Sequence, residues 1–377
     1  MIIIMRPEIG PKGPEIQQIL DHMKNYPGIT VRVHAVTGTT RTLTEVYLIG
    51  PTETVDPDGI AGLPGVERVV RISERYRLIG RHRGQMEAVG FEYNGLTFNQ
   101  ETFHVFSGLC AVDTRENVEK VMRVLQRHGQ VTCRMGAYKP RTSPYEFQGH
   151  GKECLPYVFE LAGKYGIKVI AMEITHEDQI QEIRRCLELS GQPTGVMLQI
   201  GTRNAQNFEL LKVLGQQRDF PVLLKRGMGI TLEESLNACE YVASEGNRKV
   251  VFCLRGVKTH LGDPHRNLVD FAHVPVVKRL TRMPVCIDPS HSVGRKDISP
   301  DGLSDILHAT AQGVIAGANM VLADFHPAPE KALCDGPQAL LLEEMDLFLK
   351  DVAIVREAYE KRRALVQAPQ GSSVHSR

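Results

Sequence analysis

Short runs of consecutive apolar residues recur along most of this chain, separated by longer segments with the periodicity of amphipathic helices. From about residue 103 onward the apolar runs are His104–Leu109, Val131–Met135, Ile167–Met172, Gly195–Ile200, Pro221–Leu224, Lys249–Leu254, Pro284–Ile287 and Met320–Ala323. A strand that is buried on both faces reads as a continuous apolar run because neither face meets water. The pattern therefore predicts buried, parallel strands.

The segments between these runs carry apolar residues at helical spacing. The clearest are Asn117–Arg127, Leu155–Tyr165, Glu177–Leu189, Asn207–Gly215, Thr231–Glu245 and Leu303–Ala316. Eight alternations of strand and helix predict a closed (β/α)8 TIM barrel over residues 103–363. A doubly wound open sheet is the alternative, but eight repeats over about 250 residues fit the usual size of the barrel better.

Residues 1–80 follow a different pattern, in which two βαβ-like halves predict a small ferredoxin-like α+β domain. Its expected elements are strand Ile2–Met5, helix Pro14–Tyr26, strands Thr30–Val36 and Thr44–Ile49, a short helix near Asp58–Gly62 and strand Glu67–Ile72. No acid, base and nucleophile converge there. Two interpretations stay open: a packing or oligomerisation module, and a sensor of a small molecule.

Two further segments flank the predicted barrel. Residues 81–102 read as a polar, basic connector followed by a hairpin, because Asn-Gly in Tyr93-Asn-Gly-Leu is a strong hairpin-turn signal. Residues 364–377 are polar and rich in small residues, and we expect a disordered tail there.

Composition narrows the function classes. The 377 residues contain 45 Lys+Arg and 44 Asp+Glu, a net charge of +1, so the chain lacks the broad cationic surface of a nucleic-acid or anionic-membrane binder. No apolar run approaches the ~20 residues that span a bilayer, and the start does not resemble a signal peptide, so we expect a cytoplasmic protein. The eight cysteines form no Cys-x-x-Cys pair, which indicates reduced thiols that mostly serve packing.

Charged side chains gather where the predicted strands end, which is where the active site of such a barrel lies. Many like charges are costly to bury together unless an anion lies among them, and arginine matches phosphate and carboxylate geometry. The alternative is a set of surface salt bridges. The cations that would converge on this mouth are Arg134, Lys139, Arg141, Arg203, Lys225, Arg226 and Arg255.

A second set of strand-end residues offers a thiol, an imidazole and two carboxylates: Cys110, His291, Asp324 and Asp335. This mixture suits a divalent ion such as Mn²⁺, Fe²⁺, Co²⁺ or Zn²⁺ with open coordination positions. Sequence spacing alone does not make a metal motif, and a core thiol is the other interpretation of Cys110. His326, two residues after Asp324, could be a ligand, an acid–base group or a structural partner.

Several of these segments together resemble the 3-deoxy-7-phosphoheptulonate (DAHP) synthase family, in its short microbial branch with an N-terminal ferredoxin-like domain. The resemblance rests on Lys139-Pro-Arg-Thr-Ser-Pro-Tyr-Glu-Phe-Gln-Gly, Gln199-Ile-Gly-Thr-Arg-Asn-Ala-Gln-Asn-Phe, Pro221-Val-Leu-Leu-Lys-Arg-Gly, Asp288-Pro-Ser-His-Ser-Val-Gly-Arg and His326-Pro-Ala-Pro-Glu-Lys-Ala-Leu-Cys-Asp-Gly-Pro-Gln. The related octulosonate-forming family usually has Lys-Ala-Asn-Arg-Ser-Ser where this chain has Lys139-Pro-Arg-Thr-Ser. That difference favours the four-carbon acceptor, erythrose 4-phosphate.

The resemblance implies condensation of phosphoenolpyruvate (PEP) with erythrose 4-phosphate and release of phosphate, the first step of the shikimate pathway to aromatic amino acids. It places Arg134, Lys139, Arg203, Lys225 and Arg255 on PEP, and Arg141, Thr142 and Ser143 on the aldose phosphate. It places a divalent metal on Cys110, His291, Asp324 and Asp335. Lys139 is then the candidate acid, with a pKa lowered by surrounding cations, while Glu173 would orient water or Lys139.

The resemblance also implies a homo-oligomer, a tetramer or dimer, controlled by an aromatic amino acid bound to its N-terminal domains. Three positions depart from the family pattern: Leu109 stands where proline usually precedes the first ligand, and Asp324 and Asp113 each replace a glutamate. These departures keep two alternatives open. One is a PEP-dependent synthase of secondary metabolism with another aldose phosphate, and the other is a catalytically silent binding or regulatory paralogue.

Overall fold

The computed structural model describes residues 1–37, 42–70, 76–82 and 90–367. The chain divides into two compact units, 1–77 and 78–377, and each is described by itself. The predicted strand end at Ile72 and most of the predicted tail lie outside the described residues.

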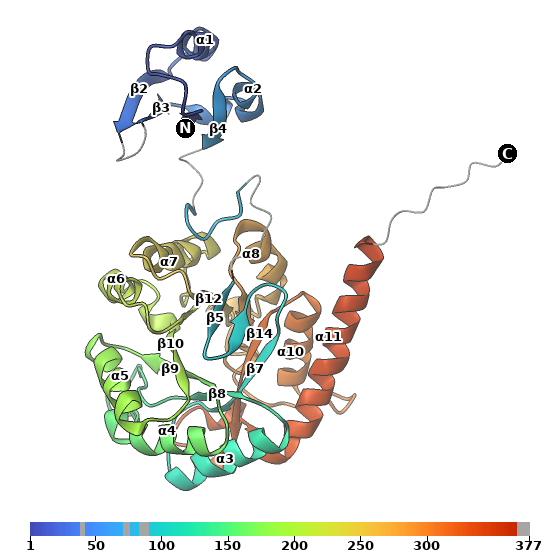
Figure 1. Cartoon of the computed structure of the whole chain (residues 1–377). Helices are drawn as coiled ribbons and strands as arrows, with labels where there is room; N and C mark the ends of the chain where they lie inside the picture. The colour runs from blue at the N-terminus through green and yellow to red at the C-terminus, as the bar shows by residue number, and fades with distance from the viewer. Residues whose placement is uncertain (38–41, 71–75, 83–89, 368–377) are drawn as a thin grey trace, which may run out of the picture. The chain divides into compact units, whose positions relative to one another are not determined.

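The first unit is a four-stranded antiparallel sheet with strand order β2-β3-β1-β4, and two helices complete the βαββαβ order (Figure 1). Its elements are β1 (Ile2–Met5), α1 (Pro14–Met23), β2 (Thr30–Thr37), β3 (Thr42–Ile49), α2 (Pro57–Ala61) and β4 (Val66–Val70). Ile3, Ile19, Val46 and Ile60 form the centre of its core, each fully buried. The ferredoxin-like prediction is confirmed.

The second unit is a closed barrel of eight parallel strands, as the apolar runs predict. The strands are β7 (His104–Leu109), β8 (Thr132–Met135), β9 (Val169–Ile174), β10 (Gly195–Ile200), β11 (Val222–Lys225), β12 (Val250–Leu254), β13 (Val285–Ile287) and β14 (Met320–His326). Closure comes from β14, which pairs with β13 on one side and with β7 on the other, in register from Met320 opposite His104 to Asp324 opposite Gly108. A short strand, β15 (Leu340–Leu341), pairs with the end of β14.

Helices surround these strands (Figure 1). They are α3 (Arg115–Arg127), α4 (Leu155–Lys164), α5 (Asp178–Ser190), α6 (Phe208–Gln216), α7 (Leu232–Ser244), α8 (Val274–Leu280), α9 (Pro289–Val293), α10 (Asp305–Ile315) and α11 (Met345–Gln367). Single 3₁₀ turns lie at Thr52–Thr54, Gly151–Glu153, Thr202–Asn204, His260–Gly262, Phe271–His273, Pro329–Lys331, Gly336–Gln338 and Leu342–Glu344. Among the described helices, none has both the length and the apolar character to cross a membrane.

The last helix extends beyond the point where the tail is expected to begin. Residues 364–367 are helical rather than disordered. Arg363 forms an ion pair of 2.8 Å with Glu101, and Arg362 donates a hydrogen bond of 2.9 Å to the carbonyl of Ile315. These contacts hold the final turns of α11, which the local composition does not reveal.

The predicted hairpin is present and closes the N-terminal end of the barrel. Strands β5 (Phe91–Tyr93) and β6 (Leu96–Phe98) pair through a two-residue turn in which Asn94 and Gly95 both have positive φ angles, 48° and 76°. Phe98 is 2% exposed and packs with the inward residues of the barrel strands. The floor of the barrel is therefore sealed, and the opposite end is left open for a site.

Candidate active site

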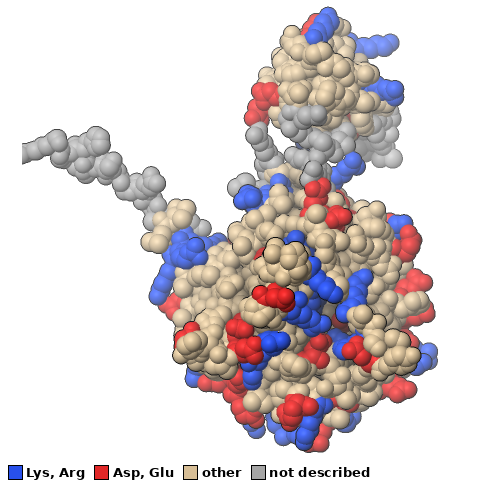
Figure 2. All heavy atoms as spheres, turned by 180° about the vertical axis from the view of Figure 1, so that it is seen from behind, with Lys and Arg blue, Asp and Glu red and all other residues tan. Residues whose placement is uncertain are grey.

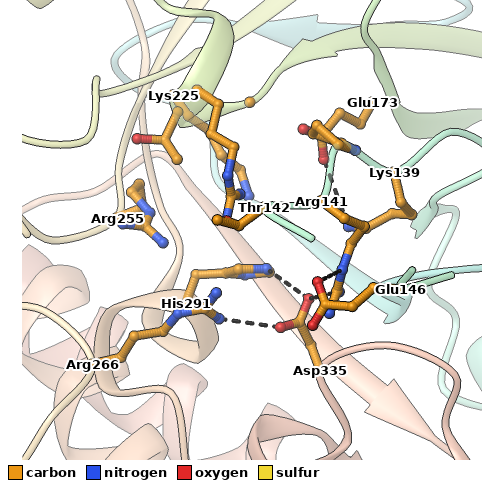
Figure 3. A pocket seen from close by; sticks show the side chains of 14 residues that line it. Lys139, Arg141, Thr142, Glu146, Glu173, Lys225, Arg255, Arg266, His291 and Asp335 are labelled. Atoms are coloured by element: carbon orange, nitrogen blue, oxygen red, sulfur yellow. Dashed lines mark hydrogen bonds and ion pairs between the residues drawn. The ribbon is translucent and has the colours of Figure 1, made fainter. Parts of the chain in front are cut away.

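A pocket opens at the carboxyl ends of the barrel strands, where the loops bring several cations together (Figure 3). Its lining residues are Lys139, Pro140, Arg141, Thr142, Glu146, Glu173, Gly201, Thr202, Arg203, Lys225, Arg255, Arg266, His291 and Asp335. Figure 2 likewise shows lysines and arginines gathered near the middle of one face of this unit, with acidic side chains dispersed around them. The net charge of +1 thus conceals a local cationic cluster.

Arg255 is the cation whose surroundings point most directly to an anionic ligand. It follows β12 and is 3% exposed, yet its Nε and NH1 atoms have no hydrogen-bond partner among the described residues. Burial lowers the pKa of this guanidinium below its usual range, although the carboxylates of Asp288 and Asp270 oppose that shift. A buried charge without partners is costly, and an anion in the pocket would supply the missing hydrogen bonds.

The neighbouring cations are held by buried carboxylates. Lys225 at the end of β11 donates a hydrogen bond of 2.5 Å to Asp288, and Arg134 on β8 is paired with Asp324. Lys139 lies 3.6 Å from Glu173. These ion pairs fix the direction of each cation before any ligand arrives, which reduces the entropy lost on binding.

The predicted lowering of the Lys139 pKa is wrong. Burial alone would lower it, but Cys110, 3.2 Å away, and the carboxylate of Glu173 outweigh burial and raise the pKa above its usual range. Glu173 is packed against Gly201, where an added Cβ would come within 1.9 Å of the carboxylate oxygen. Glycine at 201 therefore makes room for the carboxylate that keeps Lys139 charged.

The basic loop after β8 lies on another side of the same pocket. Arg141 is paired with Glu146 at 2.9 Å, and Arg203 donates a hydrogen bond of 2.9 Å to the hydroxyl of Thr142. Thr142 lines the pocket with both arginines, whereas Ser143 is not among the lining residues and accepts a hydrogen bond from the backbone N–H of Tyr145.

Two further predicted site residues, Arg226 and His326, do not line the pocket. On β11, Leu223 packs inside the barrel, so Lys225 points inward as well and Arg226 points to the other face. Arg226 forms a buried ion pair of 2.8 Å with Asp270 and is not a lining residue. The alternation of side chains along a strand places only one member of the Lys225-Arg226 pair at the mouth.

His326 is the second such residue. Its Nε2 lies 2.7 Å from a carboxylate oxygen of Asp113, and its Nδ1 accepts a hydrogen bond of 3.0 Å from the backbone N–H of Ala328. Both ring nitrogens are occupied, and the side chain is 5% exposed. Of the three roles left open for His326, the geometry favours the structural one.

The four predicted metal ligands come together beside the pocket, with Cys110 close to the other three. Donor atoms of Cys110, His291 and Asp324 lie within 4.8 Å of one another. The sulfur of Cys110 is also 3.1 Å from a carboxylate oxygen of Asp335. These donor types fit a divalent ion.

His291 is oriented by a carboxylate behind it. Its Nδ1 lies 3.1 Å from Asp288, which leaves Nε2 facing Cys110 and Asp335 at 3.6 and 3.7 Å. Burial opposes the charged ring, but Asp288 outweighs it and raises the pKa of His291 to about 10. A carboxylate behind a histidine is the usual arrangement for a metal ligand, and an ion would replace the proton on Nε2.

Sequence reasoning misses three residues that shape the site. Asp288 supports both Lys225 and His291, while Gln338 donates a hydrogen bond of 2.6 Å to Asp324. Arg266 lines the pocket and forms an ion pair of 3.1 Å with Asp335. Asp288 and Gln338 lie inside the motifs that carry the family resemblance, so the sequence could have indicated both. No motif includes Arg266, and its neighbouring sequence does not indicate a role in the site.

Comparisons with known proteins identify the same family over both units of the chain. A model of the DAHP synthetase I family matches residues 88–361, and a model of the DAHP synthase ferredoxin-like domain matches residues 1–74. A phospho-2-dehydro-3-deoxyheptonate aldolase from Thermotoga maritima is 35% identical, over 91% of this chain and 94% of its own.

A more distant relative has the name of a related aldolase, and a solved structure matches most of the chain. A 2-dehydro-3-deoxyphosphooctonate aldolase from Aliivibrio salmonicida is 26% identical, over 67% of this chain and 89% of its own. The crystal structure of the Thermotoga maritima DAHP synthase superimposes with a TM-score of 0.67 and 31% identity, over 95% of this chain and 96% of that one. These similarities do not favour the two alternative functions.

Proposed function

This chain belongs to the DAHP synthetase I family and is an aldolase-type transferase, and from that premise we propose that its barrel mouth joins PEP to erythrose 4-phosphate. The products are the seven-carbon 3-deoxy sugar phosphate and inorganic phosphate. The observation that carries the proposal is Arg255, which lines a pocket shared with Lys225, Lys139 and Arg203 and has two buried nitrogens without a partner among the described residues. We place the reaction in the cytoplasm, where free cysteines remain reduced.

PEP carries a phosphate and a carboxylate, and the pocket offers cations enough for both. Arg255 and Lys225 hold one anionic group, and Lys139 and Arg203 hold the other, with Arg134 buried behind them against Asp324. The Nε and NH1 atoms of Arg255 have no partner among the described residues before the ligand arrives, whereas Lys225 already has Asp288 at 2.5 Å. Binding therefore gives the buried guanidinium of Arg255 its missing partners, which adds to the affinity for the anionic substrate.

The acceptor enters beside the basic loop, with its phosphate held by Arg141 and the Thr142 hydroxyl. Arg203 bridges the two substrate regions because it hydrogen-bonds Thr142 while lining the pocket. This placement sets the aldehyde of the acceptor near Cys110 and His291 and within reach of C3 of PEP. Orientation of the two reacting carbons is a large part of what such a site contributes to the rate.

The donor atoms of Cys110, His291, Asp324 and Asp335 fit a divalent metal ion, and such an ion would polarise the aldehyde as a Lewis acid. During condensation C3 of PEP bonds to the aldehyde carbon, water adds at C2, and the C–O bond to the phosphate breaks. Lys139, kept charged by Glu173, donates a proton to the developing alkoxide or assists departure of the phosphate. Glu173, 3.6 Å from Lys139, orients that ammonium group.

The direct test is release of inorganic phosphate by the purified full chain, first treated with a chelator and then given Mn²⁺, Fe²⁺, Co²⁺ or Zn²⁺. We expect release to require PEP, erythrose 4-phosphate and a metal together. A panel of aldose phosphates of four and five carbons, with product masses measured, serves as the control for acceptor choice. Absence of release with erythrose 4-phosphate under every metal would contradict the proposal.

Regulation completes the proposal. We assign the first unit, residues 1–77, the role of binding an aromatic amino acid, tyrosine or phenylalanine, in a homo-oligomer. Its support is the match of residues 1–74 to the ferredoxin-like domain of DAHP synthases and the separate core that this unit has.

A further inference from the structure

The sulfur of Cys334 lies beside two residues of the proposed metal centre, Cys110 and Asp335. We propose that Cys334 binds the metal together with Cys110, His291 and Asp335, and that the site therefore prefers a thiophilic ion such as Zn²⁺ or Co²⁺ to Mn²⁺. This inference rests on the proposed function, since it concerns the same centre. It goes further because it assigns a ligand and a metal class that the family pattern does not supply.

The first support is the position of the sulfur. Cys334 Sγ lies 2.9 Å from the Oδ2 atom of Asp335, and Cys110 Sγ lies 3.1 Å from the same oxygen. The donor atoms of Cys110, Cys334 and Asp335 all lie within 4.8 Å of one another. In a tetrahedral site with bonds of 2.0–2.3 Å, ligand atoms are separated by about 3.3–3.8 Å, so small movements would seat an ion among them.

The second support is the engagement of Asp324. Arg134 holds one of its carboxylate oxygens, and Gln338 donates a hydrogen bond of 2.6 Å to the other. A carboxylate that is committed on both oxygens is a weaker metal ligand than a free one. Asp335 is less enclosed: its side chain is 13% exposed, and its Oδ2 faces the two sulfurs and His291.

Donor chemistry then decides the metal class. Two thiolates, one imidazole and one carboxylate form a soft, tetrahedral set that favours Zn²⁺ and Co²⁺, whereas Mn²⁺ prefers oxygen ligands in octahedral geometry. Cys334 is 6% exposed and Cys110 is 6% exposed, so water competes little with the sulfurs. The rival role for Cys334 is to position Arg141, whose NH1 atom lies 2.7 Å from its sulfur.

Cobalt substitution separates these roles, because each thiolate bound to Co²⁺ contributes to the near-ultraviolet charge-transfer absorbance. The full chain is stripped of metal, kept under a non-thiol reductant and titrated with Co²⁺, and the absorbance is expressed per bound cobalt. We expect Cys334→Ser to retain about half of the wild-type absorbance, as one of two thiolates is lost. Cys186→Ser, on α5 and only partly buried, is the matched control and should match the wild type.

Competition between Zn²⁺ and Mn²⁺ provides the second measurement. Cys334→Ser should reduce the preference for Zn²⁺ by about tenfold or more, since a soft ligand is replaced by a hydroxyl. Full wild-type absorbance per cobalt in Cys334→Ser would overturn the inference and leave Cys334 as a positioning residue, with a raised KM for the acceptor. A wild-type chain that binds no cobalt would overturn it as well, and the phosphate-release assay then shows separately whether the proposed function survives.

Discussion

At the barrel mouth the cations differ in whether the protein itself supplies a counter-ion. Arg134 and Lys225 are buried against Asp324 and Asp288, so their charges are balanced before any ligand binds. Arg255 is equally buried, but two of its nitrogens have no partner among the described residues. The paired cations give the site its shape, whereas Arg255 provides the free binding capacity. Its removal should therefore affect stability and function in opposite directions.

Arg255→Met tests this expectation. Because it removes a buried charge that lacks hydrogen bonds, the thermal midpoint of the ligand-free protein should rise, while stabilisation by PEP should disappear. Loss of two charged hydrogen bonds of about 1.5–3 kcal/mol each predicts a fall in kcat/KM for PEP of about 10²-fold or more. Differential scanning fluorimetry with and without PEP, together with steady-state kinetics, measures both effects.

Arg226→Met is the matched control, since Arg226 comes from the same barrel rim but is paired with Asp270. Removing it leaves a buried carboxylate without its cation, which should cost about 3–5 kcal/mol of unfolding free energy. A destabilised Arg255→Met protein, or one that still gains stability from PEP, would contradict the anion-binding role of Arg255.

His326→Gln tests the structural role of the His326–Asp113 pair. Both side chains are buried, so we expect the free energy of unfolding to fall by about 2–3 kcal/mol, as measured by urea denaturation. The pH profile of kcat should keep its shape, because the ring does not line the pocket. A changed pH profile at unchanged stability would instead identify His326 as an acid or base in the reaction.

Among the elements of the barrel unit, the β5–β6 hairpin is anchored by contacts that its own sequence only partly indicates. The β5–β6 hairpin occupies the N-terminal end of the barrel, and Asn94 fixes it by donating hydrogen bonds of 2.6 and 3.1 Å to the carbonyls of Lys168 and Pro193. Tyr93 packs against Gly195 and accepts a hydrogen bond of 3.0 Å from Val196. The hairpin therefore contributes to the packing of the barrel interior at its N-terminal end. The residues that line the pocket lie at the opposite, open end.

Phe98→Ala is the corresponding prediction for the hairpin. Phe98 is almost fully buried on β6, so the cavity left by its ring should cost about 3–5 kcal/mol of unfolding free energy, measured by chemical denaturation. Leu96→Ala, at a partly buried position on the same strand, should cost distinctly less. KM for PEP should be unchanged in both variants, because the pocket lies at the opposite end; a large change in KM would show that the two ends are coupled.

Lys278, in the last turn of α8, gives the barrel a pH-dependent stability. Burial lowers its pKa from 10.5 to about 8, with Glu101 opposing the shift, while its ammonium donates hydrogen bonds to the carbonyls of Gln100 and Gly317. Between these two pH values the unfolded chain binds more protons than the folded one. The contribution of Lys278 to stability therefore rises as pH increases from about 8 to about 10.5.

Below pH 8 the cost of burying the charged Lys278 side chain is present in full. At about 1.4 kcal/mol per pKa unit, the shift from 10.5 to about 8 corresponds to a cost of about 3 kcal/mol. Lys278→Met should flatten this part of the stability curve relative to the wild type. Urea midpoints followed by circular dichroism at pH 7.5, 8.5 and 9.5 would measure the difference, and equal slopes in the two proteins would contradict the prediction.

On the scale of the whole molecule, the two units each have their own core. The barrel unit begins at Leu78, where the backbone N–H groups of Leu78 and Ile79 donate to Glu240 at 2.8 and 3.1 Å. Every residue that lines the pocket belongs to this second unit. The proposed synthase chemistry and the proposed regulation are thus assigned to different units of the chain.

Deletion of residues 1–77 tests that separation. We expect the remaining chain to keep metal-dependent phosphate release, since its core and pocket are complete. It should lose any thermal shift and inhibition that tyrosine or phenylalanine produces in the full chain. Persistence of the amino-acid response after deletion would assign the effector site to the barrel unit.

The periodicity of apolar residues is enough to predict both architectures, because strands buried on both faces and amphipathic helices leave direct marks in the sequence. The motifs also indicate most residues of the pocket, since a barrel must bring its strand ends to one mouth. The motifs do not indicate which acidic side chain pairs with each of these cations. The Lys225-Arg226 pair reads as two equivalent cations, yet strand alternation sends Arg226 to Asp270. The local sequence likewise gives no sign that α11 is held through residue 367.

The sequence by itself therefore determined the two folds, the cationic character of the mouth and the kinds of donor atom available to a metal. Only the tertiary structure decided which charges are already paired, because pairing depends on distances between residues far apart in the chain. It left two nitrogens of Arg255 without a partner among the described residues, raised the pKa of Lys139 through Cys110 and Glu173, and committed His326 to Asp113. It also brought Cys334 beside Cys110, a proximity of residues 224 positions apart (334 − 110) that closure of the barrel produces.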